Sequence, residues 1–413
     1  MGEKANLTSV ETLVESPFII ATIGGVTFGS YSAQHTYGSA VKVTYPNYMT
    51  SLSVQKINGT VNTYTINFTY QVRAGEDPNR LDKIFSRATK DRQISLQYGD
   101  WNAPKHIYKE ESAIITGITY NLNMSNSSIN YTLTCTSDAV GLSSVSYNFP
   151  ARYAKPSDVL REMLSNARYG MKDVFTGMRN QQEVLAKNLI ASNDKKVKLD
   201  QKNTTPLSYM NYLVESMVSS TNSNTEVKKD STYFLTIHDD ASNNGGVYFK
   251  VTEVKQSAKS FTATDTYVLD VNYPSDHYVT NFNVTNDQSW AILYDYGEDV
   301  NQESFTYSIT DDGLLASEYS PSLVRSKTTL QQSQQKSNWW SRMTQFPVQA
   351  EITIKGLIRP SILMSYVYLN VWFAGAQKHI SSGLYIITKQ VDAIDASGYR
   401  TTLSLMRVGG DEG

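Results

Sequence analysis

The stretch HISSGLYIITKQVDAIDASGYRTTLSLMRVGG, residues 379–410, ends the chain with two strand-like runs joined by a turn. Between the runs, residues 395–398 read Asp-Ala-Ser-Gly, a composition typical of tight turns. Five apolar residues of the two runs recur at odd positions, the period of half-buried β-strands: Tyr385, Ile387, Val391, Leu403 and Leu405. The sequence therefore predicts a terminal β-hairpin whose Leu403 and Leu405 face a core.

Two further β-hairpins are predicted in the first third of the sequence. Residues 40–72 hold two alternating runs separated by Asn58-Gly59, a dipeptide typical of hairpin turns. Residues 113–137 hold a second pair, which turns at residues 125–128. The first strand of this pair places four apolar residues on one face: Ile118, Tyr120, Leu122 and Met124. Short strands of this kind favour a small antiparallel barrel or sandwich.

Helices are predicted in two places. Residues 79–88 follow Asp77, a helix-capping residue, and carry apolar side chains at helical spacing. Three amphipathic segments, which begin at Pro156, Met178 and Pro206, predict a helical middle part. Strands resume after a polar linker and continue to the end of the sequence, except at residues 323–338, whose Gln-rich composition predicts a helix or an exposed connection.

Length and composition set the fold class and the domain organisation. A chain of 413 residues exceeds what one hydrophobic core usually organises, and its 28 tyrosines favour strands. We expect a mainly β protein with a helical insert, of the α+β class. The expected divisions are an N-terminal arm (1–16), a first β domain (17–150), a helical middle segment (151–230), a β insert (231–274) and a second β domain (275–413).

Two regions of the chain resemble each other. AIITGITYNLNMSNSSINYTLTCTS (113–137) and LYIITKQVDAIDASGYRTTLSLMR (384–407) share an Ile-Thr strand start, a small polar turn and a return strand rich in Thr and Leu. A duplication of one β domain would produce this similarity. We therefore expect two related β domains separated by the middle insert.

Charge and cysteine content exclude several protein classes. The 37 basic and 39 acidic residues give a net charge of −2 and are spread along the chain, so we expect no specific nucleic-acid binding. Cys135 is the single cysteine, so no intrachain disulfide is possible, and its strand position predicts a buried apolar role. No apolar run is long enough for a signal peptide or a membrane span, which predicts folding in the cytoplasm.

The sequence contains no motif that indicates catalysis, metal binding or cofactor binding. A nucleophile elbow, a phosphate loop, a dinucleotide fingerprint and a zincin motif are all missing. The nearest acidic cluster, His238-Asp239-Asp240, precedes a turn that aspartates commonly cap. Glu110 and Glu111 are adjacent on a predicted strand and point to opposite faces. We therefore predict no catalytic, cofactor-binding or metal-ligating residues, no cofactor and no enzymatic activity.

Residues 348–410 resemble the last domain of the baseplate hub proteins of contractile-tailed bacteriophages. The resemblance rests on a Ser-Gly-x-Tyr strand, an Asp-x-Ile-Asp turn and a Leu-x-Leu-x-Arg ending. LQYGDW (96–101) and ITGITYNL (115–122) look similar to the first domain of that family. Residues 155–273 contain no sequence motif that resembles this family.

The resemblance implies a structural virion protein with two tail-tube-like β domains per chain. Three such chains would form a pseudo-six-fold ring in the tail baseplate, assembled in the host cytoplasm. The implied partners are the tail tube protein, the central spike or tip protein and the baseplate wedge proteins, and DNA would pass through the lumen. The resemblance does not identify partner-binding residues.

The alternative is a tail-associated adhesin or carbohydrate-binding protein. Trp101 and the pair Trp339-Trp340 would stack on sugars if they were exposed, whereas in a hub they would anchor a core or an interface. Binding to a glycan array would distinguish the two classes. A peptidoglycan hydrolase, a third class, would need a catalytic domain for which two β domains and an insert leave no room.

Overall fold

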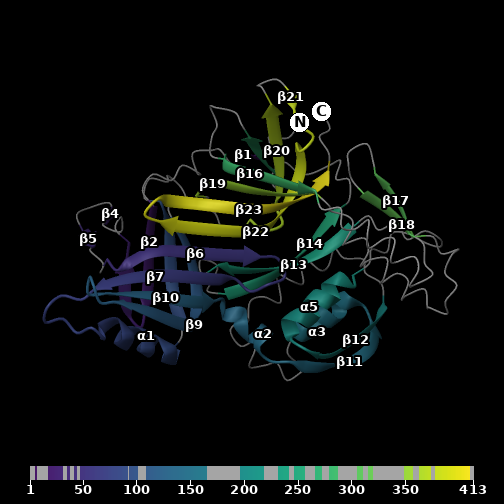
Figure 1. Ribbon diagram of the computed structural model, residues 1–413. Coiled ribbons are helices and arrows are strands. Elements are labelled where there is room, and N and C mark those ends of the chain that lie inside the picture. The colour runs from purple at the N-terminus through teal and green to yellow at the C-terminus, as the bar shows by residue number, and fades with distance from the viewer. Residues whose placement is uncertain are drawn as a thin grey trace.

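A computed structural model gives the fold shown in Figure 1. It describes residues 5–6, 17–30, 35–37, 41–43, 47–91, 93–100, 108–164, 196–217, 231–240, 246–255, 266–271, 279–286, 305–309, 315–319, 348–356, 362–373 and 377–409.

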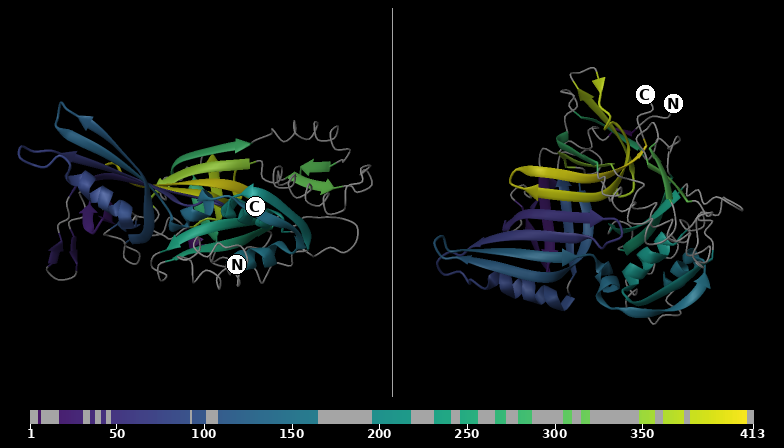
Figure 2. Two further views of the ribbon diagram at one scale, coloured as in Figure 1. Left: turned by 90° about the horizontal axis from the view of Figure 1, so that it is seen from below. Right: turned by 45° about the vertical axis from the view of Figure 1, so that its right-hand side comes forward.

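The first β unit is an antiparallel sheet with the strand order β6-β7-β10-β9-β8-β2-β3. Its strands are β2 (Pro17–Ile23), β3 (Val26–Gly29), β6 (Met49–Ile57), β7 (Thr63–Gln71), β8 (Gln93–Asp100), β9 (Tyr108–Asn123) and β10 (Ser128–Thr136). Helix α1 (Arg80–Asp91) lies along one face of this sheet (Figure 2). The Phe85 ring of α1 packs 5.2 Å from Phe68 and 5.4 Å from Tyr131, measured between ring centroids. Alternating apolar residues of the strands and one face of α1 thus close the first core.

The second β unit has the strand order β16-β19-β23-β22-β20-β15. Its strands are β15 (Thr266–Val271), β16 (Val279–Asn286), β19 (Val348–Lys355), β20 (Tyr366–Phe373), β22 (Gly383–Asp395) and β23 (Gly398–Gly409). Its core contains Ile352, Leu369, Ile387, Leu403 and Leu405, all buried. The short strands β1 (Ala5–Asn6) and β21 (Gln377–Lys378) extend it beside β15 and β20.

The two units form one continuous sheet. The second half of β22 pairs antiparallel with β6, from Lys389 opposite Ile57 to Ile394 opposite Leu52. Figures 1 and 2 show the terminal hairpin lying along the first unit. Ile394 and Tyr399, at the tip of this hairpin, are buried in the core of the first unit. The hairpin therefore joins the two halves of the molecule.

The middle of the chain has a core of its own. It is built from the 3-10 turn η2 (Asp138–Val140), α2 (Gly141–Ser144), β11 (Tyr147–Ala154), α3 (Pro156–Leu164), β12 (Val197–Thr204), α5 (Pro206–Glu215), β13 (Ser231–Asp240) and β14 (Gly246–Lys255). Helix α5 begins where Thr205 caps it: the Thr205 hydroxyl accepts a hydrogen bond from the Ser208 amide at 3.2 Å. The sequence predicted a division between a helical segment (151–230) and a β insert (231–274), but residues of both contribute to this one core.

Two further small hairpins are described: β4 (His35–Tyr37) pairs with β5 (Val41–Val43), and β17 (Phe305–Ile309) pairs with β18 (Leu315–Tyr319).

The expected fold class, mainly β with a helical insert, is confirmed. The three predicted hairpins are present as β6–β7, β9–β10 and β22–β23, and the helix predicted at 79–88 is α1. The helices predicted at Pro156 and Pro206 are α3 and α5. The segment predicted at Met178 lies outside the described residues. The domain boundaries stay a prediction.

Candidate assembly surface

The acidic candidates from the sequence lie on strands of different cores. Asp239 and Asp240 are the last residues of β13, where their backbones pair with Val247 and Gly246 of β14. Glu110 and Glu111 are consecutive residues of β9. Among the residues that the structure describes, no three His, Cys, Asp or Glu side chains gather as a metal site would require.

The remaining candidates are one buried cysteine and three tryptophans. Cys135 is fully buried in the first core, as predicted, and burial raises the pKa of its thiol to about 12. A thiol with so high a pKa is neutral at physiological pH and therefore weakly nucleophilic. Trp101 and Trp339-Trp340 lie outside the described residues.

The two β units share a β-bulge at the same place. In the first unit, Thr116 of β9 has no partner on β10, because Ile115 pairs with Cys135 and Gly117 pairs with Thr134. The Thr116 hydroxyl donates a hydrogen bond of 3.1 Å to the Thr134 carbonyl. A bulge with one extra residue shifts which side chains face the core beyond it.

The second unit repeats this arrangement. Thr388 is the unpaired residue of β22, between Ile387, which pairs with Leu405, and Lys389, which pairs with Ser404. The Thr388 hydroxyl donates a hydrogen bond of 3.1 Å to the Ser404 carbonyl. Thr116 and Thr388 therefore occupy equivalent positions, as the shared Ile-Thr strand start had indicated.

The equivalence extends across five strands of each unit. β6 has a bulge at Thr50 against β7, and β16 has one at Thr280 against β19. The strand orders β6-β7-β10-β9-β8 and β16-β19-β23-β22-β20 match position by position, and every neighbouring pair in both is antiparallel. The units differ at the next strand, since β2 is antiparallel to β8 whereas β15 is parallel to β20.

The hairpin turns of the two units differ in length, with four residues between Asn123 and Ser128 and two between Asp395 and Gly398, but they share one hydrogen-bonding pattern. In the first, the Asn123 side-chain oxygen accepts hydrogen bonds from the amide and the hydroxyl of Ser125, at 3.2 and 2.6 Å. In the second, one carboxylate oxygen of Asp395 accepts the same two bonds from Ser397. The hydrogen bond from Ser397, above all, holds the pKa of Asp395 below its usual value.

Buried polar side chains of the terminal hairpin lie beside the join between β22 and β6. Asp392 is 1% exposed and accepts hydrogen bonds from Gln390 at 3.0 Å, Tyr399 at 3.2 Å and Thr401 at 2.7 Å. Lys56 of β6, opposite Gln390, is 0% exposed. Such a network fixes the register of β22 against β23, because a slip would leave buried polar groups without partners. No sequence pattern indicated the network, since these residues alternate with apolar ones as solvent-facing residues do.

The β6–β7 turn ties three parts of the molecule together. The Asn58 amide donates to the Thr388 carbonyl of β22 at 3.1 Å, and the Gly59 amide donates to the Leu235 carbonyl of β13 at 2.7 Å. The Asn211 side chain of α5 donates to the Gly59 carbonyl at 2.8 Å. Gly59 has φ +73°, and a Cβ there would lie 2.9 Å from the Asn211 side-chain oxygen. The predicted Asn-Gly turn is therefore also a junction with the middle core.

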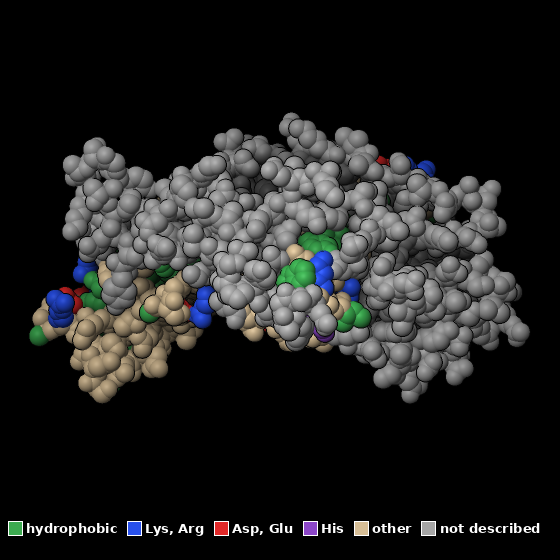
Figure 3. Space-filling model, turned by 90° about the horizontal axis from the view of Figure 1, so that it is seen from above, with side chains coloured by type: hydrophobic (Ala, Val, Ile, Leu, Met, Phe, Trp, Pro, Cys, Tyr) green, Lys and Arg blue, Asp and Glu red, His purple; other side chains and the backbone are tan. Residues whose placement is uncertain are grey.

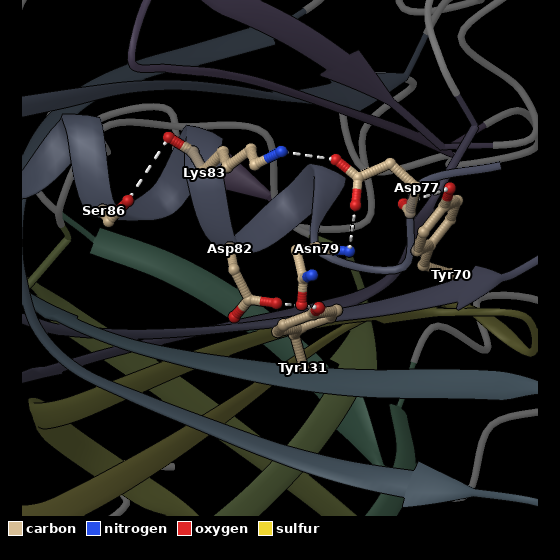
Figure 4. Close-up of polar contacts among 7 residues, drawn as sticks. All are labelled: Tyr70, Asp77, Asn79, Asp82, Lys83, Ser86 and Tyr131. Atoms are coloured by element: carbon tan, nitrogen blue, oxygen red, sulfur yellow. Dashed lines mark hydrogen bonds and ion pairs between the residues drawn. The ribbon is translucent and has the colours of Figure 1, made fainter.

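Helix α1 is fastened to the sheet by hydrogen bonds at its N-terminal end (Figure 4). The Tyr131 hydroxyl of β10 donates to the Asp82 carboxylate at 2.8 Å, and burial, together with this carboxylate, raises the pKa of Tyr131. The Tyr70 hydroxyl donates to the Asp77 carbonyl at 3.1 Å. The side-chain hydrogen bond from Lys83, at 2.6 Å, lowers the pKa of the Asp77 carboxyl. These contacts hold α1 over Tyr131 and leave the distal part of β9 uncovered.

That distal part of β9 is an exposed apolar edge. β8 stops pairing with β9 at Ile114, so the following residues pair with β10 alone among the described strands. Ile118, Tyr120 and Leu122 lie opposite Leu133, Tyr131 and Ile129, which are core residues, and so face the core side of the sheet. They are nevertheless 36, 57 and 54% exposed, and Met124 is 86% exposed. The sequence predicted that these four apolar residues share one face, and the structure shows that this face is exposed. An exposed apolar strip of this kind marks an interaction surface.

The described part of the face in Figure 3 shows no large charged patch. In Figure 3, backbone and uncharged polar side chains predominate where the face is described, and Lys, Arg, Asp and Glu occur in small groups. One face of the first sheet carries a neutral ladder, in which Asn67 bonds Ser51 at 2.8 Å and accepts from Thr132 at 2.7 Å. Within the described part of the chain, no helix has the length and apolarity needed to cross a membrane.

Comparison with solved structures shows that the fold is similar to that of a tail protein. A tail protein from Neisseria meningitidis MC58 has a TM-score of 0.50 and 10% sequence identity, over 95% of this chain and 97% of that one. A 43 kDa tail protein of prophage MuSo2 from Shewanella oneidensis has a TM-score of 0.48 at 11% identity, over 95% and 98% of the two chains.

A third similar structure is an Escherichia coli type VI secretion component described as similar to the T4 tail proteins gp27 and gp5. Its TM-score is 0.46 at 9% identity, over 87% of this chain and 73% of that one. No protein-family model matches the sequence, and no curated protein matches it.

Proposed function

We propose that this chain is the hub protein of a contractile phage tail baseplate, a structural protein that joins the tail tube to the central spike. The observation that carries the proposal is the internal duplication: two β units with matching strand order and bulges, joined edge to edge through β22 and β6. The tail-protein fold supports it.

A duplicated unit lets a three-fold assembly match a six-fold one. Three copies of this chain would place six similar β units in a ring, and a closed ring needs the same contact repeated around one axis. One face of that ring would receive the tail tube protein, and the other a three-fold spike or tip protein. Baseplate wedge proteins would bind the outside, where the middle core is a candidate contact.

The proposal includes no enzymatic step and no cofactor. It places the protein in the virion, after assembly in the host cytoplasm, with DNA passing through the lumen without sequence-specific contacts. The balanced charge of −2 and the neutral ladder on the first sheet support passage without tight binding, because strong nucleic-acid binding requires concentrated positive charge.

Cryo-microscopy of the native tail tests the proposal. We expect three copies of the chain on the tail axis, between the tube and the spike. Six copies, or a position at the periphery of the particle, would exclude a hub. A glycan array probed with the purified chain provides the second arm: specific sugar binding would favour a tail-associated adhesin instead.

A further inference from the structure

We propose that the free edge of β9 pairs antiparallel with β16 of a second copy of this chain, in the register that β22 and β6 use within one copy. The inference rests on the proposed ring and names the strands and residues that close it. β9 and β22 are equivalent strands, and so are β16 and β6.

The edge of β9 is open where the edge of β22 is occupied. The pairing of β8 with β9 ends at Ile114 of β9, and the pairing of β20 with β22 ends at the equivalent Ile386 of β22. Each end lies two residues before the bulge threonine. Beyond the bulge, β22 takes β6 as its neighbour, whereas the same part of β9 pairs only with β10 among the described strands. An open edge presents unpaired backbone groups, and proteins that expose an apolar edge usually pair it.

The chain also carries the matching strand. Within the described residues, β16 pairs only with β19, so its outer edge corresponds to the edge of β6 that β22 occupies. Phe282 and Val284 of β16 are only half-buried against the second core, while Asn281, Asn283 and Thr285 are exposed.

The internal join gives the register residue by residue. Aligned on their bulges, Leu122 is equivalent to Ile394 and Phe282 to Leu52, and Ile394 pairs with Leu52. Transferring this pairing sets Leu122 opposite Phe282 and Tyr120 opposite Val284 on one face. It sets Asn121 opposite Asn283 and Thr119 opposite Thr285 on the other.

The side chains brought together in this way are complementary. Apolar residues meet apolar residues on the core side, and amide and hydroxyl side chains meet on the opposite side, where cross-strand hydrogen bonds can form. None of these eight positions carries a charge. The contact is head to tail, because one end of each copy meets the other end of the next, so it either closes a ring or grows a filament.

A pair of cysteines tests the register in assembled tails. Asn121→Cys with Asn283→Cys places the two thiols directly opposite, within reach of a disulfide. The matched control, Asn121→Cys with Asn281→Cys, uses the same face two residues away, where a diagonal pair is about 7 to 8 Å apart. The native Cys135 is buried and stays in both variants. We expect at least ~10-fold more interchain disulfide from the first pair than from the control.

The outcomes separate this inference from the proposed function. An on-axis ring of three copies without the disulfide between positions 121 and 283 would keep the hub assignment and overturn the strand pairing. Equal cross-linking of both pairs, or a disulfide from position 121 to another tail protein, would also overturn it. A particle with no three-fold ring would overturn both.

A charge on the exposed edge provides an independent test. Leu122→Asp should abolish incorporation into tails, because it buries a carboxylate against Phe282 of the neighbouring copy. Val145→Asp is the matched control: Val145 is 50% exposed and Leu122 is 54% exposed, so neither change should unfold the chain. Circular dichroism confirms that both variants fold. Incorporation of Leu122→Asp at the level of the control would contradict the pairing.

Discussion

β22 and β9 have the same backbone plan but different neighbours. Both strands carry a bulge at a threonine, and both extend beyond the end of one neighbouring strand: β20 beside β22, and β8 beside β9. β22 is covered by β6 of the same chain and uses buried Gln390 and Asp392, whereas β9 is open and presents Ile118 and Tyr120 at the equivalent positions. The comparison shows that equivalent positions of one backbone plan can carry either a buried polar network or an exposed apolar strip. The apolar strip is the one that leaves a surface for another contact.

The largest effect is expected in the core beneath the second bulge. Leu405, 1% exposed, is equivalent to Cys135 of the first unit. Leu405→Ala should lower the free energy of unfolding by roughly 2 to 5 kcal/mol, because it leaves a cavity. Cys135→Ala removes a single sulfur and should cost about 1 kcal/mol. Urea unfolding measures both, and equal losses would show that the two cores are not packed alike.

The polar network of the terminal hairpin, beside the internal join, should be nearly as important. Asp392→Ala leaves the donors of Gln390, Tyr399 and Thr401 without their acceptor, so we expect a loss of about 3 kcal/mol. Tyr120→Ala, at the equivalent open position, should change stability by less than about 0.5 kcal/mol. Asp392→Asn keeps one acceptor oxygen and should fall between them. Thermal unfolding of the three variants would contradict the comparison if Tyr120→Ala were the most damaging.

Substitution of two glycines with similar backbone conformations distinguishes the cost of a positive φ from the cost of a steric clash with a neighbouring side chain. Gly59→Ala should cost roughly 2 to 3 kcal/mol, since it adds a clash with Asn211 to the penalty of a positive φ. Gly25 has φ +79° with nothing within 4 Å of a Cβ, so Gly25→Ala should cost only about 1 kcal/mol. Chemical denaturation measures the difference. Equal costs would mean that the β6–β7 turn is not held against α5.

The smallest expected effect concerns the two hairpin turns at low pH. The pKa of Asp395 is lowered in the folded chain, first by the hydrogen bond from Ser397, so its stabilisation is present above its unfolded pKa and is lost as the pH falls through the folded pKa. The side chain is 37% exposed, which limits the effect to a few tenths of a kcal/mol.

Asp395→Asn gives the second turn the neutral residue that Asn123 provides in the first. The stability difference between this variant and the natural chain should shrink below about pH 4. Melting temperatures measured between about pH 3 and pH 7 test this, and a constant difference would show that the Asp395 carboxylate does not stabilise the turn.

The sequence by itself determined the local structure. The period of two located the hairpins, Asn58-Gly59 located a turn with a positive φ, and helical spacing after Asp77 located α1. The repeated Ile-Thr start indicated a duplication, and the structure places both threonines in matching bulges. These features could be predicted from the sequence because each depends on residues that are close together in the chain.

Only the tertiary structure decided which edges are covered. β6 and β22 lie far apart in the chain, so no local pattern shows that they pair or that Lys56 and Asp392 become buried. The same pattern placed Ile118, Tyr120 and Leu122 on one face but could not show that this face is open, because exposure depends on where the neighbouring strand stops. Burial is a property of the assembled sheet, and a one-dimensional period specifies a face without specifying what lies against it.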